Sequence, residues 1–237
     1  MPAAVNSLVE ALTTLNAAFA QMTASLGVTV EGPLWSGSLD SLAGRQLKWV
    51  YPAAADDDEF LKRATLASTL VIDELEVPLM RCMLASIATN LHQNDKSPPR
   101  TLGSRNLLQR LTFVAALIEN FQPDIEEIHT LVKQAEGKNV EGSDGDVQAE
   151  LTKVYERVRG DFAPLAFLYD LRVHGGLAHR PNRAEAGNAA QNLGLPRENW
   201  HRSDYLRLLN LVTQSIRIVA AHLYTAANIR IRAEQEA

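Results

Sequence analysis

The chain has 237 residues, of which 46% are hydrophobic, 22% are charged and 6% are aromatic, and its net charge is −5. This length and composition are ordinary for a globular protein with a sizeable core. A single cysteine, Cys82, excludes an internal disulfide and a cysteine-based zinc cluster, and we expect it to be a small core residue. No apolar run reaches the roughly 18–20 residues that a membrane-spanning helix needs, and the first residues lack a basic signal-peptide start. We therefore expect a cytoplasmic protein with no membrane contact.

The charge is distributed unevenly along the chain. From Arg172 to the C-terminus there are nine arginines, no lysine and five acidic residues, whereas residues 1–171 have fourteen basic and twenty-three acidic residues. Arginine favours bidentate binding of phosphate groups. Ordinary charge on helix surfaces explains the same composition, so both interpretations stay open. The acidic remainder argues against a broad coating of nucleic acid, and any RNA is expected to bind at one patch.

Helical periodicity dominates the first hundred residues. The expected elements are a helix over residues 3–26 that stops at Gly27, a looser stretch with a short helix before Tyr51, an acidic helix start at residues 56–59, a helix from there to Leu91 with a break at Pro78, and a polar turn over residues 94–99. This region, residues 1–100, is expected either to complete one bundle with the rest of the chain or to form a separate module.

The remaining residues, 101–237, are expected to form a helical bundle. Its elements are a helical segment over residues 104–136 interrupted at Pro123, a flexible loop over 137–145, a helix over 146–180 bent near Pro164, a long connection over 181–202, and a last helix capped by Ser203 or Asp204 that extends to about Arg232. The abundance of alanine and leucine and the lack of alternating strand patterns favour helix. The predicted fold class is therefore an all-α helical bundle with long antiparallel helices.

The strongest candidate for chemistry is the pair Arg172 and His179. Seven residues of an α-helix turn through about 700°, so the two side chains are expected within about 20° of one helix face. Pro181 stops this helix, which places His179 in the last turn, where the helix dipole favours a protonated imidazole. A histidine that transfers a proton near neutral pH and an arginine that stabilises phosphate charge are suited to phosphate chemistry.

The segment Asp170-Leu-Arg-Val-His-Gly-Gly-Leu-Ala-His179 resembles the Arg-x4-6-His signature of HEPN domains, with their Leu-Arg start and Ala-His end. The resemblance covers chiefly residues 165–183, together with the expected helical bundle over residues 104–235. It implies a helical bundle that forms a homodimer in which the two motifs face each other. It further implies a metal-independent endoribonuclease of a toxin–antitoxin or phage-defence system, with RNA as substrate and an antitoxin or another protein as a partner. Arg172 and His179 would then be catalytic and would bind and activate the scissile phosphate, with the RNA 2′-hydroxyl as the attacking group.

Further polar residues flank this pair. The candidates for substrate binding are His174, Asn182, Arg183 and Arg202, and Trp200 is a candidate to stack on a base. A polar, exposed loop without any RNA contact would have the same composition. That alternative stays open.

A noncatalytic function is the second hypothesis. Val173 stands where active HEPN members usually have a polar residue. In this alternative the protein is a helical dimerisation or interaction protein, Arg172 forms a salt bridge with Asp170 or a neighbouring helix, and His179 only caps a helix.

Histidines elsewhere in the chain offer weaker signals. Glu126-x-x-His129 and Glu198-x-x-His201 have the spacing of di-iron bundles, but the two further inward glutamates of such a site are not evident. We therefore expect no metal site and no cofactor. His222 is expected to be a core or interface histidine with satisfied hydrogen bonds.

Overall fold

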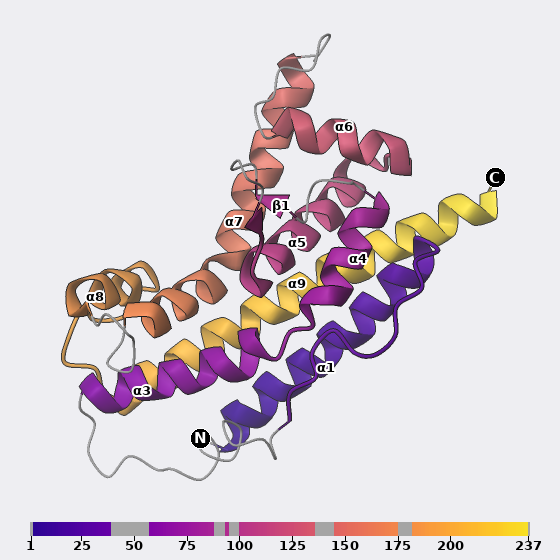
Figure 1. Cartoon of the computed structure of the whole chain (residues 1–237). Helices are drawn as coiled ribbons and strands as arrows, with labels where there is room; N and C mark the ends of the chain where they lie inside the picture. Colours follow the sequence, from indigo (N-terminus) through magenta and orange to yellow (C-terminus); the bar gives the residue numbers. More distant parts are fainter. Residues whose placement is uncertain are drawn as a thin grey trace. The chain divides into compact units, whose positions relative to one another are not determined.

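The computed structural model describes residues 2–38, 57–87, 93–94, 100–135, 145–174 and 182–236. In these ranges the chain forms eight α-helices, one π-helical turn and one pair of short strands (Figure 1). The strands, β1 (Gln93–Asn94) and β2 (Arg100–Thr101), pair antiparallel and have two residues each. The prediction of an all-α fold is confirmed.

The helices group into two compact units, each assembled from three separate parts of the chain. Unit 1 consists of Met1–Leu15, Trp35–Leu75 and Phe162–Arg217, and unit 2 consists of Asn16–Leu34, Glu76–Asp161 and Ile218–Ala237. Three long helices supply residues to both units: α1 (Pro2–Ser25), α7 (Gly145–His174) and α9 (Arg202–Glu236). Neither unit corresponds to residues 1–100 or to residues 101–237, because each of these regions supplies segments to both.

Unit 1 contains the predicted acidic helix start. α3 (Asp57–Ser68) begins with Asp57, Asp58 and Glu59, whose negative charges are favourable at a helix N-terminus. The helix continues into η1 (Thr69–Asp73), a π-helical turn whose Leu70, Val71 and Ile72 are buried. The indole N–H of Trp35 donates to the Leu70 carbonyl at 2.7 Å and so fixes this turn from the side.

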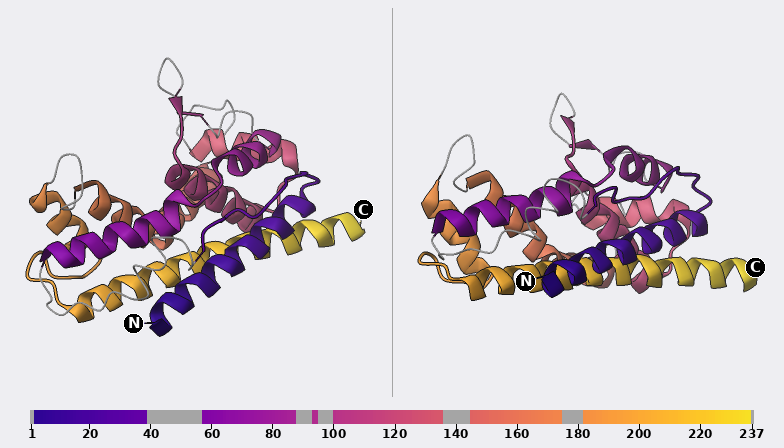
Figure 2. Two further views of the ribbon diagram at one scale, coloured as in Figure 1. Left: turned by 60° about the horizontal axis from the view of Figure 1, so that its bottom comes forward. Right: turned by 90° about the horizontal axis from the view of Figure 1, so that it is seen from below.

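The core of unit 1 is aliphatic. Leu8 of α1, Leu61 of α3, Leu168 of α7 and Leu209 of α9 are all fully buried. Within this unit α7 and α9 run in opposite directions, as predicted, whereas α1 lies beside α9 and runs in the same direction (Figures 1 and 2). The guanidinium of Arg217 links α9 to α1 by donating to the Ser7 hydroxyl at 2.9 Å.

Unit 2 contains α4 (Val77–Ile87), α5 (Ser104–Phe121) and α6 (Ile125–Ala135), together with parts of α1, α7 and α9. The predicted break at Pro78 is confirmed, since α4 starts at the preceding residue and a proline is tolerated in a first helical turn. Pro123 separates α5 from α6, also as predicted, and α5 ends at Phe121, which is followed by Gln122 with a left-handed φ of 47°. Fully buried side chains from four helices, including Met83, Val114, Leu151 and Leu223, form the core of unit 2.

The prediction of a long connection over residues 181–202 is wrong, because Arg183–Asn192 forms α8. The side chain of Asn182 caps this helix by accepting the Glu185 N–H at 3.3 Å. The pattern Asn-x-x-Glu was a signal for this cap. Ser203 and Asp204 lie inside α9, which starts at Arg202, although the Asp204 carboxylate does accept the His201 N–H at 2.8 Å.

The prediction that Cys82 is a core residue is also wrong, because its side chain is exposed. The buried face of α4 is made by Met80, Met83, Leu84 and Ile87. Cys82 lies two positions from Met80 and therefore on a different side of the helix.

Several predicted elements lie outside the described residues. These are the short helix before Tyr51, the end of the helix that was expected to reach Leu91, most of the turn over 94–99, the loop over 137–145 and the last turn of the helix over 146–180. Among the helices that the structure describes, none is both long and apolar enough to cross a membrane.

Candidate functional site

Arg172 lies in the last described turn of α7, in unit 1. Leu165, Leu168 and Leu171 precede it at helical spacing, and their burial fixes this end of α7 in the core. One terminal nitrogen of the Arg172 guanidinium donates to the carboxylate of Asp73, the last residue of η1. The two side chains are 32% and 36% exposed. Arg172 is therefore both ion-paired and accessible to solvent.

The chain leaves α7 and returns close to the same point. The His174 carbonyl accepts the Asn182 N–H at 3.0 Å, so the residues on either side of segment 175–181 are adjacent. Asn182 then caps α8. His179, the predicted partner of Arg172, lies outside the described residues.

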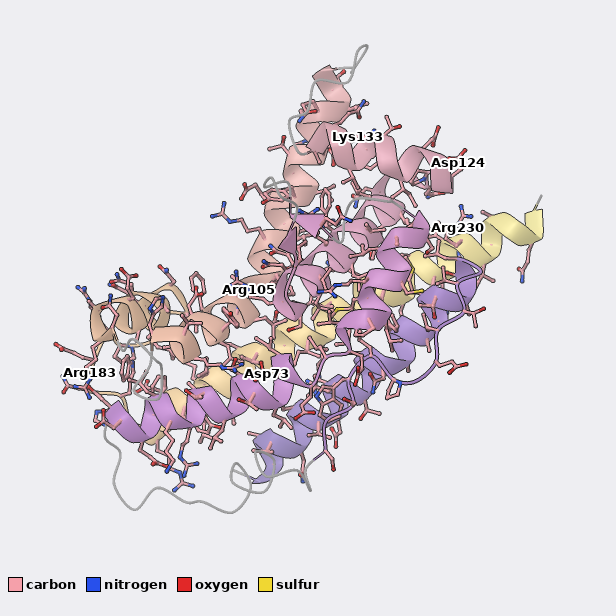
Figure 3. All side chains as sticks on the ribbon, viewed as in Figure 1. Asp73, Arg105, Asp124, Lys133, Arg183 and Arg230 are labelled. Atoms are coloured by element: carbon pink, nitrogen blue, oxygen red, sulfur yellow. The ribbon has the colours of Figure 1, made fainter. Side chains whose placement is uncertain are left out.

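Arg183, the first residue of α8, is bound to a different part of unit 1. It donates to Asp58 at 2.6 Å, and both side chains are largely exposed. Asp58 and Asp73 are fifteen positions apart along α3 and η1, which corresponds to about 20 Å at about 1.5 Å per residue. Figure 3 shows Arg183 and Asp73 at opposite ends of this helical segment. Arg172 and Arg183 thus bind carboxylates at separate places and do not form one compact cluster.

The remaining candidate residues for substrate binding have mixed surroundings. His174 is partly exposed, and its backbone carbonyl accepts the hydrogen bond from the Asn182 N–H. Asn182 uses its side chain as a helix cap. Arg202 is exposed at the first position of α9.

Carboxylates of α3 and η1 contact the arginine-rich region within unit 1. Asp73 binds Arg172, Asp58 binds Arg183, and the Asp57 carboxylate accepts the backbone N–H of Trp200 at 2.9 Å. These three contacts connect residues 57–73 with residues 172–200, which are distant in sequence. The sequence offered no pairing signal for Asp73, whose role is visible only in the fold.

The prediction that Trp200 stacks on a base is wrong for the described structure. Its side chain is 2% exposed and stacks on Phe60 of α3, with ring centroids 4.6 Å apart and an interplanar angle of 18°. The indole N–H donates to the Pro196 carbonyl at 2.5 Å. Trp200 is a core residue that packs the chain before α9 against α3.

A second polar cluster lies in unit 2, around His222 of α9. Its Nδ1 lies 2.9 Å from Oε2 of Glu119 on α5, and its Nε2 lies 3.3 Å from Oδ2 of Asp161 on α7. Arg157 adds a cation 3.6 Å from the same oxygen of Glu119. Burial alone would lower the pKa of His222, but the hydrogen bonds and charges of Glu119 and Asp161 outweigh it and raise the pKa. The prediction of a satisfied core histidine is confirmed.

This cluster is suited to structure rather than to proton transfer with a substrate. Both ring nitrogens of His222 face a carboxylate, and only 8% of the residue is exposed. A protonated imidazole donates through both nitrogens, so His222 links α9 to α5 and α7 when it carries its charge.

Candidate metal ligands are not assembled in the part of the chain that the structure describes. No group of three or more His, Cys, Asp or Glu side chains there has the arrangement of a metal site. The side chains of Glu126 and His129 lie outside the described set, whereas Glu198 and His201 are exposed.

Comparison of the chain with protein-family models, with curated proteins and with solved structures finds no match. The HEPN resemblance therefore rests on the residues of the chain itself. Of these residues, 165–174 and 182–183 are described.

Proposed function

We propose that the protein is a HEPN-like helical protein that binds RNA at Arg172 and cleaves it without a metal ion. The observation that carries this proposal is the position of the partly exposed Arg172 in the last described turn of α7, three positions before the start of segment 175–181, which contains His179. Asp73 engages one terminal nitrogen of its guanidinium. An arginine has five N–H donors in a planar fork, so the others suit a phosphate group.

The proposed reaction needs only the RNA and the side chains of the protein. The RNA 2′-hydroxyl attacks the neighbouring phosphorus, and the bond from phosphorus to the 5′ oxygen breaks. The 2′-hydroxyl loses a proton to a base, and the 5′ oxygen receives one from an acid. His179 is suited to proton transfer and Arg172 to stabilising the additional charge on the phosphate. The products are a 2′,3′-cyclic phosphate and a 5′-hydroxyl.

The proposed setting follows from the same resemblance. The protein acts in the cytoplasm as a homodimer in which two copies bring their Arg172 segments together, and an antitoxin or another protein controls it. The membership in a toxin or phage-defence system is part of this proposal. Molecular mass in solution, measured by light scattering, tests the dimer independently of activity.

Cleavage of a labelled RNA in the presence of a chelator tests the proposed reaction. The wild type should cleave, and Arg172→Ala and His179→Ala should each lose most of the activity. Arg159→Ala is a matched control, because Arg159 is also an exposed arginine in an ion pair on α7, with Glu156 in unit 2. Activity that is unchanged in both site variants, or absent from the folded wild type, contradicts the nuclease function.

The Arg172–Asp73 contact also favours the second candidate, a noncatalytic helical interaction protein. An arginine that forms an ion pair with a neighbouring helix is what that hypothesis predicts. In this case Arg172→Ala lowers stability or dimerisation, and no RNA cleavage occurs. The same set of variants therefore separates the two functions.

A further inference from the structure

We propose that Asp73 is a built-in competitor that holds Arg172 and lowers its affinity for phosphate. This inference rests on the proposed function, since it concerns the regulation of the same site. It assigns a specific task to a residue for which the sequence offered no signal.

The backbone places Asp73 beside α7 and holds it there. Asp73 is the last residue of η1, and the three residues before it, Leu70, Val71 and Ile72, are buried. A π-helical turn includes one more residue than an α-helical turn, so the residues that follow it are displaced by roughly 100° around the helix axis. Asp73 is the last residue of this turn, so the wider turn shifts the direction in which the segment presents its side chain. π-turns of this kind occur frequently at functional sites.

Contacts on both sides of Asp73 hold this geometry. Before it, the Leu70 carbonyl accepts the indole N–H of Trp35. After it, the Glu74 carbonyl accepts both the backbone N–H of Ser36, at 3.0 Å, and the Ser36 hydroxyl, at 3.2 Å. The carboxylate of Asp73 is therefore carried by a fixed backbone and does not depend on a loose loop.

The charges make Asp73 a competitor for phosphate. Its carboxylate occupies one terminal nitrogen of Arg172, so a phosphate must either displace it or bind beside it. Both situations are opposed by the negative charge of Asp73, because like charges at this range repel each other. The ion pair is about one-third exposed on each side, with 32% for Arg172 and 36% for Asp73, and such pairs are weak enough for another anion to replace.

The test compares the binding of a short fluorescent RNA, measured by anisotropy, to the wild type, Asp73→Asn, Arg172→Ala and the double variant. Asp73→Asn should bind the RNA about two- to fivefold more tightly, the range expected for removal of a weak ion pair. Asp73→Ala should change the affinity in the same direction. Arg172→Ala should bind weakly, and Asp73→Asn should add nothing in that background.

Glu156→Gln is the matched control, because it also removes one carboxylate from an exposed ion pair with an arginine, on α7 in unit 2. Its RNA affinity should equal that of the wild type. Melting temperatures confirm that each variant is folded.

Each outcome has one meaning. If Arg172→Ala weakens RNA binding but Asp73→Asn does not strengthen it, the competitor role of Asp73 is refuted and RNA binding at Arg172 is supported. If Asp73→Asn still raises the RNA affinity in the Arg172→Ala background, or if Glu156→Gln raises it equally, the increase is a general charge effect. Such a result also refutes the competitor role of Asp73. If no folded variant binds RNA, both the proposed function and the competitor are wrong.

Discussion

Replacement of His222 by glutamine should lower the free energy of unfolding, and the loss should be larger near pH 6 than near pH 9. His222 faces Glu119 through one ring nitrogen and Asp161 through the other. The side-chain amide of glutamine is neutral and can replace one of these contacts but not both. The other carboxylate then loses its contact with residue 222 while its side chain is only 15% exposed (Glu119) or 27% exposed (Asp161).

The size of the effect follows from these contacts. A hydrogen bond to a charged group contributes about 1.5–3 kcal/mol, and removal of one partner from a buried ion pair costs about 3–5 kcal/mol. The partial exposure of Asp161 and the nearby guanidinium of Arg157 reduce the cost. We expect a loss of about 2 kcal/mol near pH 6.

The pH dependence has a definite direction. The pKa of His222 is raised above its ordinary value of 6.5, so the folded state binds the proton more tightly than the unfolded chain does. The contribution of the charged histidine is complete below about pH 6.5 and is lost as the pH rises through the folded-state pKa. The difference between wild type and His222→Gln should therefore shrink from pH 6 to pH 9.

Urea unfolding, followed by circular dichroism at several pH values, measures this difference. His201→Gln is the matched control, because it changes an exposed histidine just before the same helix α9. A difference between wild type and His222→Gln that stays constant or grows with pH would refute the assignment of a charged His222 between two carboxylates. So would a loss no larger than that of the control.

Two further substitutions test the core of unit 1. Trp200→Ala should lower the free energy of unfolding by about 3–5 kcal/mol in the same urea assay, because the Trp200 ring is 2% exposed and stacked on Phe60. A loss of RNA affinity at unchanged stability would instead support base stacking by Trp200. Tyr205→Phe should leave the free energy of unfolding unchanged or raise it by about 1 kcal/mol. The buried Tyr205 hydroxyl has no hydrogen-bond partner among the described residues, and burial raises its pKa. A clear destabilisation in thermal or urea unfolding would show that this hydroxyl has a partner.

Local signals predicted much of the helical framework. The acidic start of α3, the proline in the first turn of α4, the proline before α6 and the stop of α1 near Gly27 are all determined within a few residues of chain. The asparagines, glycines and prolines of residues 181–202 indicate a loop and conceal α8, although the pattern Asn182-x-x-Glu185 indicates its N-cap. The apolar neighbours of Cys82 in the sequence indicate a core residue, but the buried face of α4 does not include it.

Long-range pairing could not be predicted in the same way. Asp73 and Arg172 are ninety-nine positions apart, and a π-helical turn shifts the direction in which Asp73 points. Trp200 meets Phe60 for a similar reason, since α3 and the chain before α9 are adjacent only in the folded unit. Sequence periodicity describes one helix at a time and carries no information on such partners. The charge imbalance predicted an arginine-rich region but not its ion pairs with acidic residues of α3 and η1.

The rate of metal-free RNA cleavage by wild type and by Arg172→Ala tests the central claim most directly. Removal of a group that stabilises charge in the transition state typically lowers the rate by about 10²–10³. We predict a loss of this size, with products that end in a 2′,3′-cyclic phosphate and with no cleavage of the corresponding DNA. Equal rates for the two proteins, or no cleavage by a folded wild-type dimer, would contradict the claim that Arg172 acts on RNA.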